Sequence, residues 1–181
     1  MQPRKGRDVL LLVLVGAALA ASLVMIHRAL GVASPWFGLA LMFDVTGVAA
    51  FARPLANPWL PGFLRKTYPW EAKGPAYGVL RVPAFGELLR HTALRKLNTN
   101  VYFDENRDRA GVIASLEWAE MAHLLAAVAL VPWLAIAHVH GSMGTAIVLW
   151  TVQVAYNVYP VLHLRWVRAR LIRLAGRRRK P

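Results

Sequence analysis

The chain has 181 residues, of which 57% are hydrophobic, and its formal net charge is +13. The length fits one domain, and the hydrophobic share exceeds that of an ordinary soluble domain. The 22 basic residues flank long apolar runs and do not pattern one globular face, so we expect a membrane protein with no nucleic-acid partner. The absence of cysteine excludes disulfides, thiolate catalysis and cysteine-ligated zinc.

Four apolar runs are candidates for membrane-spanning helices, because crossing a bilayer takes about 20 mainly apolar residues. They lie at about 9–26, 29–52, 119–137 and 144–164. The first run also resembles a cleavable signal peptide, since basic residues precede it and Ala18-Leu19-Ala20 lies inside it. It continues past Ala20, which favours a retained anchor. The short linkers, His27-Arg28 and residues 138–143, predict two antiparallel helical hairpins in a single membrane domain, residues 1–181.

The distribution of Lys and Arg predicts how the chain is oriented. The amino-terminal segment carries three, the central segment 53–118 carries ten and the tail 165–181 carries eight, whereas the two linkers carry one between them. Segments rich in basic residues stay on the cytoplasmic side of a membrane. We therefore expect both termini and the central segment in the cytoplasm, with the two linkers on the other side.

The central segment 53–118 contains no run long enough to span a membrane. Its tryptophans and tyrosines lie among basic residues, a composition typical of the lipid headgroup region. The stretch Ala84–Leu97 can place its apolar side chains on one helical side, so we predict a helix that lies in the membrane interface. From about Ala110 a helical pattern resumes and leads into the third run.

The tail 165–181 is predicted to be a basic amphipathic helix. Its last four basic residues, 177–180, are best interpreted as contacts to anionic lipid headgroups. Arg165 and Arg168 lie where the fourth run leaves the membrane, and for them lipid contact and binding of substrate phosphates remain equal alternatives. The predicted fold is thus all-α, with four transmembrane helices, interfacial cytoplasmic helices between spans two and three, and a basic C-terminal helix.

Glu120 and His123 form the most informative polar pair, because ionisable residues at membrane depth are costly and often functional. Their spacing of three places them on one helical face. The carboxylate would orient the imidazole, which would then take a proton from a hydroxyl group during acyl transfer. One alternative is a charge pair that stabilises the helix start. Another is a metal site with Glu117, but such sites need a second Glu-x-x-His motif, which the sequence lacks; we therefore predict no metal.

Other polar groups at membrane depth have weaker signals. Gln153 and Asn157 share a helical face; hydrogen bonding between helices suffices for Gln153, whereas Asn157 also fits substrate binding. Pro160 is expected to kink the fourth span and free backbone carbonyls. Asp44 is expected to be protonated or paired with a polar neighbour. Asn98-Thr99-Asn100 forms a polar turn whose amides either bind sugar hydroxyls or shape the turn.

Four sequence blocks, in order from about Trp59 to Leu171, resemble a known family. The blocks are Tyr68-Pro69-Trp70-Glu71 with Gly74 and Tyr77, Asn98-x-Asn100-Val101-Tyr102, Ala119-Glu120-x-x-His123, and Asn157-x-x-Pro160 with Arg165 and Arg168. They resemble the glycosyl-4,4'-diaponeurosporenoate acyltransferases of staphyloxanthin-type carotenoid synthesis. The resemblance implies a multi-pass protein of a bacterial-type cell membrane that transfers a fatty acyl group to a sugar hydroxyl of a glycosylated carotenoid.

The resemblance also implies a set of site residues, to which our chemical reasoning assigns roles. The candidates are Glu71, Asn98, Asn100, Glu120, His123, Asn157, Arg165 and Arg168. In our hypothesis His123, oriented by Glu120, is the base, and the three asparagines position an amphiphilic acceptor, a glycosylated carotenoid or another glycolipid. Arg165 and Arg168 would bind the phosphates of a donor such as acyl-CoA, with no bound cofactor. A non-catalytic membrane scaffold and a metal-dependent membrane enzyme are the alternative classes.

Overall fold

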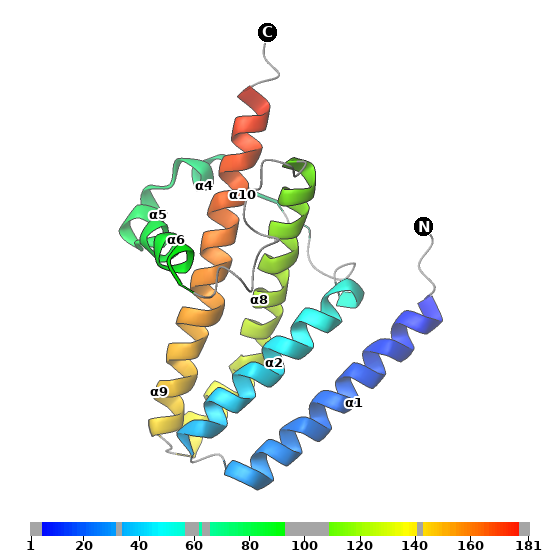
Figure 1. The fold of residues 1–181 in the computed structure, drawn as a ribbon. Helices are drawn as coiled ribbons and strands as arrows, with labels where there is room; N and C mark the ends of the chain where they lie inside the picture. Colours follow the sequence, from blue (N-terminus) through cyan, green and yellow to red (C-terminus); the bar gives the residue numbers. More distant parts are fainter. Residues whose placement is uncertain are drawn as a thin grey trace. The chain divides into compact units, whose positions relative to one another are not determined.

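The computed structural model describes residues 5–31, 34–56, 62, 66–92, 109–140 and 143–177, and every regular element in these ranges is helical (Figure 1). The elements are α1 (Lys5–Leu30), α2 (Pro35–Ala56), α4 (Pro69–Lys73), α5 (Pro75–Val79), α6 (Val82–Arg90), α8 (Arg109–Val139), α9 (Met143–Val152), the π-helical η3 (Gln153–Val158) and α10 (Tyr159–Arg177). The chain divides into two compact units. The first unit comprises Met1–Leu60 and Ala122–Val158, and the second comprises Pro61–Met121 and Tyr159–Pro181.

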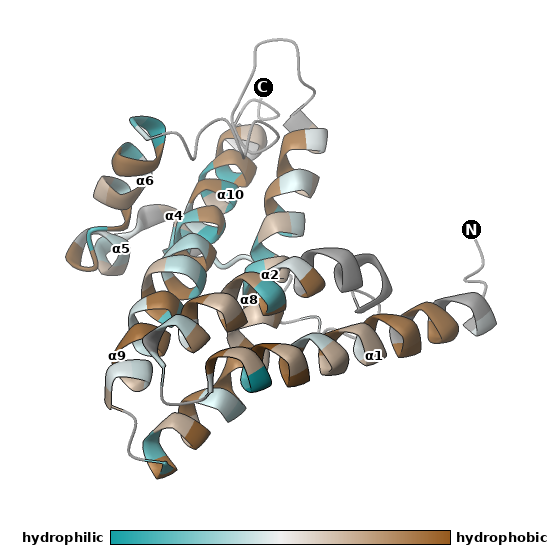
Figure 2. Cartoon of the chain, turned by 60° about the horizontal axis from the view of Figure 1, so that its bottom comes forward, coloured by the Kyte–Doolittle hydropathy of each residue, from teal (hydrophilic) through white to brown (hydrophobic). Residues whose placement is uncertain are grey.

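Among the described residues, three helical stretches are long and apolar enough to cross a membrane. They are Val9–Leu30, Ala110–Val139 and Met143–Ala175, and α2 adds a shorter apolar stretch, Trp36–Val48. Apolar residues cover most of the length of α1 (Figure 2). The length and composition of these helices indicate a membrane protein, as the sequence predicts. A crossing by α2, the two-hairpin topology and the cytoplasmic termini stay predictions.

Several helix boundaries differ from the predicted ones. α1 continues through Leu30, so His27 and Arg28, expected in a linker, belong to its last turn. α2 begins at Pro35, a residue type whose fixed φ angle suits the first helical position. α6 ends at Arg90, whereas the predicted interfacial helix extended to Leu97. Residues 93–97 lie outside the described part of the chain, and the placement of α6 in the membrane interface stays a prediction.

The first unit is held together by an apolar core that α2, α8 and α9 share. Its buried members are Phe37, Leu41, Val45, Ala126, Leu130, Leu134, Ala137, Ala146 and Leu149. α1 packs against α2, and α2 packs against α9. At Gly38 of α2 an added Cβ atom would lie 3.1 Å from the side chain of Val148, so the two helices approach closely there. Such close packing, and not the hydrophobic effect, is what associates helices within a bilayer.

Asp44 has a polar neighbour in the first unit. The hydroxyl of Ser22 on α1 donates a hydrogen bond of 2.8 Å to Oδ1 of Asp44 on α2. A second polar link connects α9 to the start of α2, where the hydroxyl of Thr145 donates to the carbonyl of Ser34 at 3.0 Å. Of the two alternatives expected for Asp44, protonation or a polar partner, the structure shows the polar partner, and this hydrogen bond ties α1 to α2.

The second unit packs α4 and α6 against α10. A small core joins α8 to α10 and consists of Val112, Leu116 and Leu164, with Ala119, Val167 and Leu171 packed around it. The short helices are set by local signals. Proline stands at or next to the first position of α4, α5 and α6, and Gly74, with a φ angle of 63°, ends α4 in the left-handed conformation. These turns hold α4 and α6 against the same helix.

Gly86 marks a close approach of α6 to α10. A Cβ atom added there would lie 2.3 Å from Cε1 of His163, whose ring also packs edge-on against Phe85. Gly86→Ala is therefore expected to push the helices apart and to destabilise the fold by about 1–3 kcal/mol, as overpacking does. The thermal unfolding midpoint in detergent measures this effect.

Gly78→Ala in α5 is the matched control for Gly86→Ala. Nothing lies within 4 Å of an added Cβ atom at Gly78, so the same chemical change should be neutral or slightly stabilising there. The double variant Gly86→Ala/His163→Ala should recover part of the loss. Equal unfolding midpoints for the two single variants would show that α6 does not pack on α10 through Gly86.

Candidate functional site

The second unit contains a group of five charged side chains, Glu71, Glu117, Glu120, Arg165 and Arg168, which we call the ion-pair cluster; three of them, Glu71, Glu120 and Arg168, are buried. Glu117 and Glu120 are three apart on α8, and Arg165 and Arg168 are three apart on α10, so each pair shares one helical face. Oε1 of Glu120 accepts a hydrogen bond of 2.9 Å from Nη1 of Arg165. Oε2 of Glu120 lies 2.7 Å from Nη2 of Arg168. Glu117 and Arg168 form a looser pair at 3.7 Å.

Glu71 brings α4 into the ion-pair cluster. It occupies the third position of α4, and its Oε2 accepts the backbone N–H of Tyr68 in a capping arrangement. Its Oε1 accepts a hydrogen bond from Nε of Arg165. The same guanidinium donates through Nη2 to the carbonyl of Lys66 at 2.6 Å. The capping residue Glu71 thus also pairs with Arg165 of α10. Because the two residues are 94 positions apart in the sequence, no local pattern predicts this pair.

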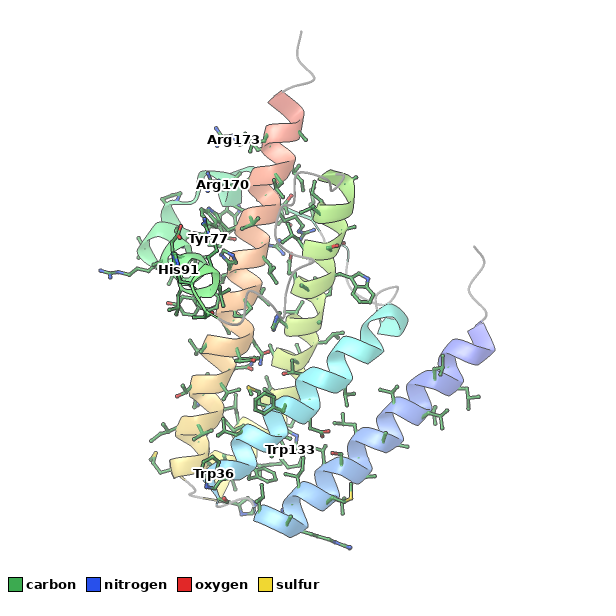
Figure 3. The ribbon with its side chains drawn as sticks, viewed as in Figure 1. Trp36, Tyr77, His91, Trp133, Arg170 and Arg173 are labelled. Atoms are coloured by element: carbon green, nitrogen blue, oxygen red, sulfur yellow. The ribbon has the colours of Figure 1, made fainter. Side chains whose placement is uncertain are left out.

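Tyr77, whose side chain is labelled in Figure 3, lies beside Glu71 of the ion-pair cluster and is only 3% exposed. Its burial, together with the negative charge of Glu71 and a hydrogen bond to that carboxylate, raises the pKa of Tyr77 to about 12. The phenol is therefore neutral at physiological pH. It acts as a further donor to Glu71, and this role did not follow from the sequence blocks.

In the ion-pair cluster, Glu120 and the two arginines have other partners than the ones predicted from the sequence. Glu120 was expected to orient His123, but both of its oxygens face Arg165 and Arg168. The two arginines were expected to bind donor phosphates, but Arg168 is only 2% exposed, and three carboxylates surround the two guanidiniums. A cluster with more acidic than basic groups does not favour a further anion. Its arrangement is that of a structural network, in which each buried charge needs its partner.

The first unit contains a second polar group, formed by His123, Gln153 and Asn157, which we call the amide–imidazole cluster. Nε2 of Gln153 donates to the carbonyl of Ala127 on α8 at 2.9 Å. Nδ2 of Asn157 donates to Oε1 of Gln153 at 3.0 Å. The imidazole of His123 lies within hydrogen-bonding reach of the Asn157 side chain and of the main chain of Tyr156. Asn157 is fully buried, and it is this amide, not a carboxylate, that lies beside His123.

The backbone of η3 explains why a main-chain group is available to His123. Pro160 has no N–H, so in an α-helix it could not donate to the carbonyl of Tyr156, four residues earlier. The structure has a π-helical turn at Gln153–Val158, and π-helical turns occur often at functional sites. The prediction that Pro160 frees a backbone carbonyl agrees with the contact between His123 and Tyr156.

The structure thus groups the predicted site residues into two sets. Glu71, Glu120, Arg165 and Arg168 lie together in the second unit, and His123 and Asn157 lie together in the first. Asn98 and Asn100 lie outside the described residues. The proposed metal ligands Glu117 and Glu120 pair with Arg168 instead, and no group of three potential metal ligands occurs within the described ranges.

The carboxyl-terminal part of α10 carries exposed basic side chains. Arg170 and Arg173 project from it (Figure 3), and the guanidinium of Arg170 lies 4.8 Å from the ring centre of Trp166. They differ from Arg165 and Arg168 on the same helix, which are directed into the ion-pair cluster. The predicted basic helix is therefore present as far as Arg177, and contact with anionic lipid stays a prediction.

Comparison with known proteins identifies the family. A family model described as glycosyl-4,4'-diaponeurosporenoate acyltransferase matches residues 61–177. The match covers well over half of the chain and includes both clusters, whereas α1 and α2 lie before it. No curated protein and no solved structure matches the chain. The resemblance seen in the four sequence blocks is confirmed by this match, and the chain belongs to the glycosyl-4,4'-diaponeurosporenoate acyltransferase family.

Proposed function

We propose that the chain is a membrane acyltransferase that moves a fatty acyl group from a donor such as acyl-CoA to a hydroxyl of a glycosylated carotenoid or a similar glycolipid. Membership of the family supports the reaction class and the glycosylated acceptor. The observation that carries the mechanism is the amide–imidazole cluster, in which His123 lies against the buried Asn157. A histidine held by an amide at membrane depth fits a general base better than it fits a structural contact.

In the proposed reaction His123 removes the proton of the acceptor hydroxyl. The hydroxyl oxygen forms a bond to the carbonyl carbon of the thioester, the carbon–sulfur bond breaks, and His123 returns the proton to the departing thiolate. The products are an ester and a free thiol. Asn157 takes the orienting role that the sequence hypothesis gave to Glu120, and Asn98 and Asn100 are proposed to hold sugar hydroxyls of the acceptor.

The charged residues have two uses in this proposal. The ion-pair cluster fixes α4, α8 and α10 to one another. The exposed Arg170 and Arg173, with the basic residues that follow, meet anionic lipid headgroups and the phosphates of the donor. The chain crosses a bacterial-type cell membrane four times with both termini in the cytoplasm, so the CoA part of the donor stays in the cytosol while its acyl chain enters lipid.

The proposal is tested by producing the chain in a bacterial host that makes a glycosylated carotenoid. Mass spectrometry of lipid extracts is expected to show the acceptor with an added fatty acyl group only when the chain is present. Isolated membranes should transfer label from radioactive acyl-CoA to the same product, whereas membranes that lack the chain should not. If the chain accumulates in membranes and neither the carotenoid nor another glycolipid is acylated, the scaffold alternative replaces the enzyme.

A further inference from the structure

The orientation of the Gln153 side chain is fixed by a main-chain carbonyl. A carbonyl oxygen can only accept hydrogen bonds, so the atom of Gln153 that lies 2.9 Å from the carbonyl of Ala127 must be the amide nitrogen. The oxygen Oε1 of Gln153 therefore points away from Ala127 and needs a donor. This assignment follows from hydrogen-bonding chemistry, since the two ends of an amide have nearly the same shape.

The Gln153 amide in turn fixes the amide of Asn157. Because Oε1 of Gln153 accepts, the atom of Asn157 that faces it at 3.0 Å must be Nδ2. Oδ1 of Asn157, which is fully buried, therefore points away from Gln153. The carbonyl of Ala127 on α8 therefore determines the orientation of the Gln153 amide and, through it, that of the Asn157 amide.

Two buried polar atoms of the amide–imidazole cluster lack a hydrogen bond of good geometry. Within the described part of the chain, Oδ1 of Asn157 and Nδ1 of His123 form no well-made hydrogen bond. Buried polar atoms are nearly always paired, and those left unpaired often mark a functional group. A hydroxyl-bearing molecule beside His123 could form hydrogen bonds with both atoms. If the Asn157 amide were rotated by 180°, its N–H groups would lie where Oδ1 lies now.

We infer that Gln153 is a positioning residue that sets the amide of Asn157 and, through it, the His123 imidazole for reaction; the inference rests on the proposed function. From the sequence alone, hydrogen bonding between helices suffices to explain Gln153. The structure gives Gln153 a further role. Its hydrogen bond to the carbonyl of Ala127 determines which end of the Gln153 amide is nitrogen, and the Gln153 amide then determines which end of the Asn157 amide is nitrogen. Gln153 itself does not touch the reacting atoms in this scheme.

Gln153→Met tests the inference, because methionine keeps the volume and length of the side chain but cannot donate or accept as an amide does. The expected result is a fall in kcat of about tenfold or more, as is typical when an orienting partner of a histidine is lost, with KM for acyl-CoA unchanged. Thr145→Val is the matched control. It removes the hydrogen bond from α9 to the carbonyl of Ser34, the residue before α2 in the first unit, and should lower the unfolding midpoint by a similar amount without lowering kcat.

A double-mutant cycle separates positioning from a general loss of structure. If Gln153 acts through Asn157, the double variant Gln153→Met/Asn157→Ala should be no slower than Asn157→Ala alone, whereas independent structural effects would multiply. All rates are taken per amount of folded protein in the membrane. If the two single effects on kcat multiply in the double variant, or if Gln153→Met keeps the kcat of an active wild-type chain, the positioning role is wrong while the proposed function stands. A wild-type chain without acyl transfer overturns the proposed function and this inference together.

Discussion

His123→Ala is expected to abolish acyl transfer while the chain still accumulates in the membrane. A general base contributes roughly 10²–10⁴-fold to a reaction rate, and alanine leaves no group in the amide–imidazole cluster that can accept the hydroxyl proton. The neighbouring amides of Gln153 and Asn157 keep their mutual hydrogen bond, because that bond does not involve the imidazole. Transfer of label from radioactive acyl-CoA, divided by the amount of chain in the membranes, measures the effect.

His140→Ala is the control for His123→Ala. His140 is exposed in the turn that follows α8, so the same replacement removes an imidazole without touching the cluster, and full activity is expected. His123→Gln adds a second comparison, because glutamine can form hydrogen bonds at this position but is not a base. Activity of His123→Gln near that of the wild-type chain would show that His123 binds the acceptor and does not move its proton.

The predictions that depend on helical spacing agree with the structure. Gln153 and Asn157 were placed on one face because they are four residues apart, and they share a hydrogen bond of 3.0 Å. The long apolar runs near positions 9, 119 and 144 coincide with the three helical stretches that, in the described part of the chain, are able to span a membrane. Such properties are local, since the rise and turn of an α-helix alone decide which neighbours share a face.

The predictions that depend on distant contacts were the ones that needed the structure. Glu120 and His123 share a helical face as their spacing requires, yet Glu120 pairs with Arg165, which follows it by 45 residues. Spacing does not reveal which of two close groups will find a partner from another helix. The basic residues of α10 were likewise hard to distinguish from one another in the sequence, although Arg168 is buried and Arg173 is exposed.

Arg168→Met is expected to cause the largest loss of stability among single arginine replacements in α10. It leaves the buried carboxylate of Glu120 without one of its two cations, and breaking a buried ion pair from one side costs about 3–5 kcal/mol. Arg173→Met is the control, because Arg173 is exposed and surface charges contribute about 1 kcal/mol or less. Unfolding of the purified chain by denaturing detergent gives the free energies of unfolding to compare.

The double variant Glu120→Gln/Arg168→Met distinguishes a structural network from a phosphate site. Removing both charges leaves no unpaired buried carboxylate at position 120, so the double variant should be more stable than Arg168→Met alone. A guanidinium that bound the donor would behave differently: its replacement would raise KM for acyl-CoA and leave the free energy of unfolding close to that of Arg173→Met. That result would restore the phosphate-binding role predicted from the sequence. We expect the opposite, because Arg168 has acidic partners on two successive turns of α8, Glu117 and Glu120.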